Sequence, residues 1–157
     1  MGQKIRREMV TQSVLKTVVL SLNTNIYATG ETLAETQEVT DALRTVNGCG
    51  IIQSIVVQDD DDQAGALDLV FFDANTSLGT ENSAVSMADN DTILGIVSIA
   101  AADYADMINS RVATKANVGI GIKAALDSTS IYMGAVSRDA KTYTASGISV
   151  RLFILQE

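Results

Sequence analysis

The chain contains no histidine, tryptophan or proline, and it has a single cysteine, Cys49, among 157 residues. Histidine serves as the general base of Ser-His-Asp and Cys-His sites and is the commonest metal ligand, so these sites are excluded. One cysteine forms no internal disulfide and builds no zinc or iron–sulfur centre. The sequence therefore predicts a protein with no catalytic residues, no metal and no cofactor.

The residues that are present predict one folded domain. Of the 157 residues, 46% are apolar and 19% are charged, which is typical of a globular protein with its own core. No internal repeat and no Ser/Gly linker divides the chain. We expect a single domain over residues 14–157, preceded by an N-terminal arm of residues 1–13.

The net charge of −8 is distributed in three zones. Residues 1–16 carry a net +3, residues 17–106 a net −14, and residues 107–157 a net +3. Binding to a phosphate backbone depends on Lys and Arg, and so acidic a body repels it. We therefore expect no nucleic-acid partner.

The first apolar run, Val14 to Leu22, is interrupted by Lys16, Thr17 and Ser21. It is too short and too polar for a signal sequence, and no run approaches the roughly 18 residues that span a bilayer. We expect no membrane partner, and we expect the chain to fold in a reducing cytoplasm without export.

Short apolar runs between turn-forming clusters favour strands over long helices. The predicted strands are Val14–Leu22, Ile51–Gln58, Leu67–Asp73, Gly95–Ala100, Val118–Ala124, Ser130–Ser137 and Gly147–Leu155. Shorter strands are expected around Tyr27 and over Glu38–Thr45, and Ala100–Ile108 suits either a short helix or an extended crossover. This pattern predicts an all-β fold, an antiparallel β-sandwich or jelly-roll-like domain.

Two of these runs make finer predictions. In the last, Ile148, Val150, Leu152 and Ile154 share one face, while Arg151 indicates that the other face is only partly covered. The run from Ile51 to Val57 is more uniformly apolar, as in a strand buried on both faces. The lack of proline removes one means of blunting sheet edges, which favours pairing with another subunit, although acidic side chains also protect edges.

The run Asp59–Asp62 has two interpretations. A solvated hairpin tip is favoured over a cation site, because the closing Glu and the helices of an EF-hand are missing. Asp89, Asp91, Asp103 and Asp106 suit loop and cap positions better than paired catalytic carboxylates.

Two further features have structural interpretations. Gly119 and Gly121 lie within an apolar run without the third glycine and following helix of a dinucleotide site, and strand glycines usually mark a bulge or close approach. Cys49 fits a turn or core position better than a nucleophile.

The N-terminal arm combines basic and apolar side chains, which suits a segment that orders on an acidic or grooved partner. Its candidate partner-binding residues are Lys4, Ile5, Arg6, Arg7, Met9 and Val10. The alternative is a frayed, solvated terminus.

Four segments in order carry a resemblance to a known group. They are Tyr27-Ala28-Thr29-Gly30-Glu31, Gly50-Ile51-Ile52-Gln53-Ser54 leading to the Asp-rich turn, Leu67 to Asp73, and Ser149 to Gln156. Together they span about residues 25–157, and the chain resembles small structural virion proteins of tailed bacteriophages.

This resemblance implies a head decoration or cement protein, made in the host cytoplasm and located on the capsid surface of the virion. It implies a β-rich homo-oligomer, a dimer or trimer, that binds and stabilises the major capsid protein shell without chemistry. The basic arm is not part of the resembling pattern.

Two alternatives follow from the residues themselves. One is a carbohydrate- or host-surface-binding module with Tyr104, Tyr132 or Tyr143 as ring faces. The other, less favoured, is a Ser/Lys or carboxylate hydrolase.

Overall fold

The computed structural model describes residues 12–87 and 91–157, and these fold as ten strands and one short 3-10 helix. In chain order they are β1 (Gln12–Val19), β2 (Thr32–Val39), β3 (Cys49–Asp59), β4 (Leu67–Phe72), β5 (Ile93–Ile99), η1 (Ala101–Asp103), β6 (Tyr104–Asp106), β7 (Arg111–Lys115), β8 (Ile120–Lys123), β9 (Ile131–Ser137) and β10 (Ile148–Gln156).

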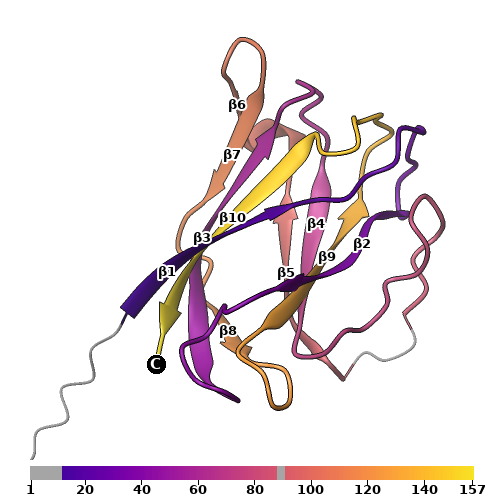
Figure 1. The fold of residues 1–157 in the computed structure, drawn as a ribbon. Coiled ribbons are helices and arrows are strands. Elements are labelled where there is room, and N and C mark those ends of the chain that lie inside the picture. The colour runs from indigo at the N-terminus through magenta and orange to yellow at the C-terminus, as the bar shows by residue number, and fades with distance from the viewer. Residues whose placement is uncertain (1–11, 88–90) are drawn as a thin grey trace, which may run out of the picture.

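The strands form two antiparallel sheets packed as layers (Figure 1). The first sheet has the order β1-β10-β3-β7-β6, and β8 also pairs with β3. The second has the order β2-β9-β4-β5. The predicted all-β antiparallel sandwich is thus confirmed.

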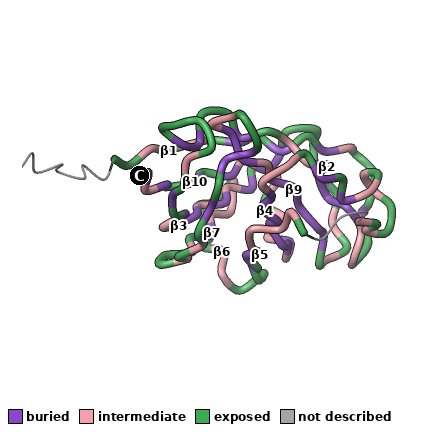
Figure 2. The backbone as a smooth tube through the Cα atoms, turned by 90° about the horizontal axis from the view of Figure 1, so that it is seen from below, coloured by how far each residue is buried: buried purple, intermediate pink, exposed green. Residues whose placement is uncertain are grey.

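The core lies between the two sheets, where buried backbone concentrates in Figure 2. From β10, Ile148, Val150, Leu152 and Ile154 are fully buried, as their alternation predicts. Residues of β4 and β9 face them from the second sheet, among them Phe71. Burying such side chains is the main favourable term in folding, at about 1.5–3 kcal/mol each.

The second sheet is also covered on its outer face. Its outward side chains, such as Val70 and Phe72, are buried in a second cluster with Leu78, from the segment that follows β4. All six residues of β4 are consequently buried. The first sheet has no such cover in the described part of the chain, so its outer face is the less buried one.

The prediction that Ile51–Val57 is buried on both faces is wrong. Ile52, Ile55 and Val57 are buried, whereas Ile51 is 41% exposed. The register with β10 shifts here, since Phe153 lies opposite Ser54 and Ile154 opposite Ile52. The bulge at Gln53 shifts the alternation of inward and outward side chains along β3. A nearly continuous apolar run can therefore form a strand that is buried on only one face.

The shorter elements were predicted less well. Tyr27 lies in a buried loop and not in a strand, held by its hydroxyl, which donates to the Glu81 carboxylate. The strand expected over Glu38–Thr45 is wrong for most of its length, because β2 (Thr32–Val39) ends at Val39 and residues 40–45 form no strand. The pattern also missed β7, and Ala100–Ile108 combines η1 with β6.

The acidic run is not a hairpin tip, because it carries the chain from β3 in one sheet to β4 in the other. Asp59 is buried, and its carboxylate accepts the backbone N–H groups of Asp61, Gln63 and Ala64 at 2.7–3.0 Å. Burial raises the pKa of Asp59 above its usual value, and the three hydrogen bonds partly oppose this rise by lowering the pKa. The turn is thus built around a buried carboxylate.

We expect Asp59→Ala to destabilise the fold by about 2–4 kcal/mol, because it leaves three partly buried N–H groups without their acceptor. The matched control is Asp60→Ala, since Asp60 is exposed and accepts only from the Gln58 side chain. Its effect should stay within about 0.5 kcal/mol. Urea unfolding followed by circular dichroism measures both, and equal effects of the two variants would contradict this account of the turn.

Candidate interaction surface

The candidate arm residues Lys4, Ile5, Arg6, Arg7, Met9 and Val10 lie outside the described residues. β1 begins at Gln12, two residues inside the expected arm of residues 1–13. Asp89 is likewise outside the described part of the chain.

The acidic side chains of the β3–β4 turn and of η1 are engaged with donors. Asp61 accepts from the backbone N–H of Thr144 at 2.7 Å, and Asp62 pairs with Arg111 Nε at 2.5 Å. Asp103 pairs with Lys115 Nζ at 2.6 Å, and this bond holds the pKa of Asp103 below its usual value. These contacts bind turns to neighbouring strands.

Within residues 12–87 and 91–157, no group of three or more Cys, Asp or Glu side chains is arranged to hold a metal ion. In the same residues, no helix has the length and apolarity needed to cross a membrane.

The tyrosines are packed into the molecule. Tyr143 is buried against Tyr27, with ring centroids 6.3 Å apart, and Tyr104 and Tyr132 are only partly exposed. Burial raises the pKa of Tyr104 and Tyr143 above the usual tyrosine value. The ring faces that the carbohydrate-binding alternative requires are therefore poorly available.

The cysteine and the two glycines that the sequence singled out lie in or beside strands of the first sheet. Cys49 is exposed at the start of β3, opposite Lys123. Gly119 has a φ of +68° just before β8, a conformation that suits glycine, and Gly121 pairs with Ile51 within the sheet.

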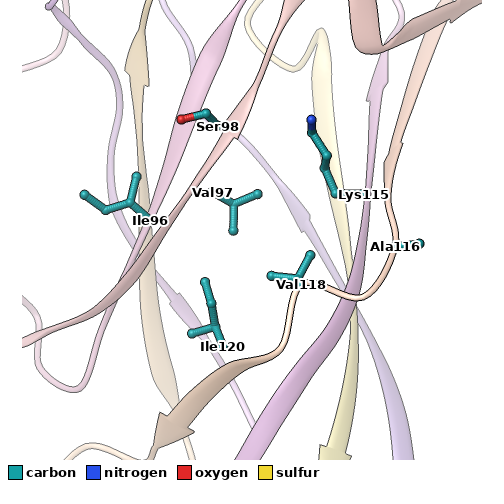
Figure 3. A pocket seen from close by; sticks show the side chains of 7 residues that line it. All are labelled: Ile96, Val97, Ser98, Lys115, Ala116, Val118 and Ile120. Carbon is teal, nitrogen blue, oxygen red and sulfur yellow. The ribbon is translucent and has the colours of Figure 1, made fainter.

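A cleft of about 300 Å³ lies between β5 and the β7–β8 segment (Figure 3). Its lining is Ile96, Val97, Ser98, Lys115, Ala116, Val118 and Ile120. Apart from Ser98, its only polar side chain is Lys115, which pairs with Asp103. The cleft offers an apolar surface but no arrangement of acid, base and nucleophile.

The outer face of the first sheet carries what we call the outer patch: Leu15, Ile51, Phe153 and Leu155. Leu15 lies directly opposite Phe153, and Leu155 lies opposite Ile51. Leu15, Ile51 and Phe153 are 49%, 41% and 42% exposed. Contiguous exposed apolar side chains on a sheet are typical of a contact surface.

The outer patch continues to an open sheet edge at β1. The Leu20 N–H donates to the Ile148 carbonyl, so by alternation Ser13, Leu15 and Thr17 direct their backbone groups away from β10. The Gln37 side chain covers only the end of this edge, where its amide donates to the Val19 carbonyl at 3.0 Å. No described residue pairs with the outward groups of these three residues.

The other edges are short or shielded. The start of β2 is covered by the segment around Glu81–Ala84, through bonds such as Thr32 N–H to the Ser83 carbonyl. β6 has three residues and β8 has four. β5 is shielded near Gly95, where Ile120 packs on it, and the rest of its outer edge borders the cleft lined by Ile96, Val97 and Ser98. Within the first sheet of the described chain, β1 is thus the longest edge left open.

The fold is that of an all-β protein of two antiparallel sheets, and its described residues leave the outer face of the first sheet bare and the edge at β1 open. No protein-family model matches the chain, and no curated protein matches it. Among solved structures, it is similar to a chain titled "Cyanophage Pam1 capsid asymmetric unit", with a TM-score of 0.37 and 15% identity, covering 94% of this chain and 86% of that one.

A second similar structure is titled desmodium yellow mottle tymovirus, with a TM-score of 0.30 and 12% identity. The match covers 92% of this chain and 86% of that one. Similarities of this size identify no family.

Part of this surface was visible in the sequence. The alternation of the last strand placed Arg151 on a partly covered face, and Phe153 shares that face. The contribution of Leu15 was not visible, because its position depends on the pairing of β1 with β10. The exposure of Ile51 could not be predicted either, because it depends on the bulge at Gln53, which forms only when β3 pairs with β10.

We expect Phe153→Ser to cost less than about 1 kcal/mol of folding free energy, because this side chain is partly exposed and lies on the outer face of the sheet, outside the core. The matched substitution one residue away, Leu152→Ala, should cost about 2–5 kcal/mol, since Leu152 is fully buried. Urea unfolding distinguishes the two. A Phe153→Ser variant as unstable as Leu152→Ala would show that the patch belongs to the core.

Proposed function

We propose that the protein is a non-enzymatic structural component of a tailed-phage virion, a decoration protein that binds and stabilises the major capsid protein shell. The observation that carries this proposal is the outer patch, an apolar cluster on the one sheet face that the described chain leaves bare. The sequence resemblance to small virion proteins supports the same role.

A protein with this role needs an extended contact surface on a rigid support. The outer patch takes its side chains from β1, β10 and β3, which pair along most of their lengths. Because the inner residues of these strands are fixed in the core, the outer ones are held in place before binding, which limits the entropy lost on association.

The charge distribution suits a protein that is soluble before assembly. The net −8 opposes aggregation, while β1 and β10 contain Lys16 and Arg151 and no acidic residue. Each contact is small, but on a shell with many equivalent sites, linked contacts raise the overall binding strength by about 10²–10⁴.

We expect the variant Phe153→Ser/Leu155→Ser to bind capsid shells at least tenfold more weakly, a loss of about 1.4 kcal/mol. The matched control is Ile108→Ser, which removes an exposed apolar side chain from the β6–β7 turn. Cosedimentation with empty shells of the phage that encodes the chain measures both. If the wild-type protein does not bind the shells, the proposal fails, and a glycan array then tests the carbohydrate-binding alternative.

Removing residues 2–11 should leave urea unfolding unchanged and weaken shell binding, because the segment carries Lys4, Arg6 and Arg7 against Glu8. The deletion ends before Gln12, which belongs to β1. Binding by the intact chain should weaken as salt rises, and the truncated chain should lose much of this dependence.

The control for the deletion keeps the segment and substitutes Lys4, Arg6 and Arg7 by Gln. It should reproduce the deletion if charge is responsible. Unchanged binding by both variants would leave the solvated-terminus interpretation in place.

A further inference from the structure

We propose that two copies of the chain associate by antiparallel pairing of β1 with β1, about a two-fold axis at Leu15. The pairing would join the first sheets of both copies into one continuous sheet. It concerns the free protein and does not rest on capsid binding.

The backbone of β1 supplies the main reason. The N–H and C=O groups of Ser13, Leu15 and Thr17 face away from β10, at alternate positions along one strand. This is the row of donors and acceptors that another strand uses to extend a sheet. β1 contains no proline to interrupt the row.

The sequence of β1 favours pairing with the same strand of a second copy, and it favours one register of that pairing. With the axis at Leu15, Leu15 meets its own counterpart, and Ser13 lies opposite Thr17 of the second copy. Lys16 then lies opposite Val14, so the two Lys16 charges do not face each other. An axis at Lys16 would place like charges directly opposite, which destabilises a strand pair.

Electrostatics favour pairing at β1 over pairing at the other end of the first sheet, β6. Two copies with a net −8 each repel one another, so they should meet where acidic side chains are absent. β1 and its neighbour β10 carry only the basic residues Lys16 and Arg151. The short edge strand β6, by contrast, contains Asp106 and is preceded directly by Asp103.

The pairing also extends the outer patch. Leu15 and Phe153 are cross-strand neighbours, so the two-fold axis brings two copies of this pair together on one face. The dimer would thus present a strip of apolar side chains about twice as long as that of the monomer. Because a single pair of edge strands buries little area, we expect association in the micromolar range.

Sedimentation equilibrium of the full chain tests the association. The average mass should rise with concentration from 16.6 kDa toward twice that value. Thr17→Pro should weaken the dimer at least tenfold, because the proline removes an outward N–H while leaving the bonds to β10 in place.

Leu15→Lys is a second variant for the same edge, in case the proline perturbs folding, and it should have a similar effect. The matched control is Ile96→Lys, which places the same charge at a strand residue that is 54% exposed on the second sheet. Loss of association by the control alone, or a chain that stays monomeric up to millimolar concentration, would overturn the proposal.

Disulfide cross-linking tests the register, in a Cys49→Ser background. Leu15→Cys should cross-link to itself, since hydrogen-bonded antiparallel neighbours have Cα atoms about 5.5 Å apart, within disulfide range. A mixture of Ser13→Cys and Thr17→Cys should cross-link between the two variants, and Lys16→Cys alone should not. Efficient cross-linking of Lys16→Cys with itself would contradict this register.

These outcomes separate the dimer from the proposed function. Loss of the dimer in Thr17→Pro with capsid binding retained would show that the two properties are independent. Capsid binding that fails in the wild-type chain, while the dimer and its cross-links are present, would overturn the decoration role and leave the pairing intact.

Discussion

The hydrogen-bonding demand of the backbone at open sheet edges is the constraint on which this structure depends. A sandwich of two sheets satisfies the interior of each sheet through its ladders but leaves outer strands with unpaired groups. This chain meets the demand at β2 with bonds from the Glu81–Ala84 segment, and at the end of β1 with the Gln37 side chain. The rest of β1 stays open, and it borders the face where apolar side chains are exposed.

The two sheets differ in how their outer faces are treated. The segment after β4 folds over the second sheet and buries Val70 and Phe72 with Leu78. The first sheet receives no such cover from the described residues, and Leu15, Ile51 and Phe153 remain partly exposed. The second sheet is thus buried on both faces. The first sheet is buried on one face and offers the other for contacts. We propose that this asymmetry directs partners to the first sheet.

Side-chain periodicity explains which parts of this arrangement could be predicted. β10 was predicted in detail, because its strict alternation separates Leu152 from Arg151 without any knowledge of neighbours. β3 was misinterpreted on one face, because the bulge at Gln53 reverses the alternation and depends on pairing with β10. The Asp59–Asp62 turn was placed correctly in the chain, but its connection between sheets depends on strand order, which local sequence does not encode. The surface could be predicted only in part for the same reason, since the neighbours of Leu15 come from the other end of the chain.

An open edge and a bare face on the same sheet are the physical basis of the proposed role in assembly. The most direct test of this claim is amide hydrogen exchange of β1, followed by NMR as the protein concentration is raised. The amides of Ser13, Leu15 and Thr17 should exchange quickly in dilute protein and become protected with concentration. Those of Val14, Lys16 and Val18, which face β10, should be protected throughout. Fast exchange of the first three amides at every concentration would contradict the account, because the edge would then be satisfied by water alone.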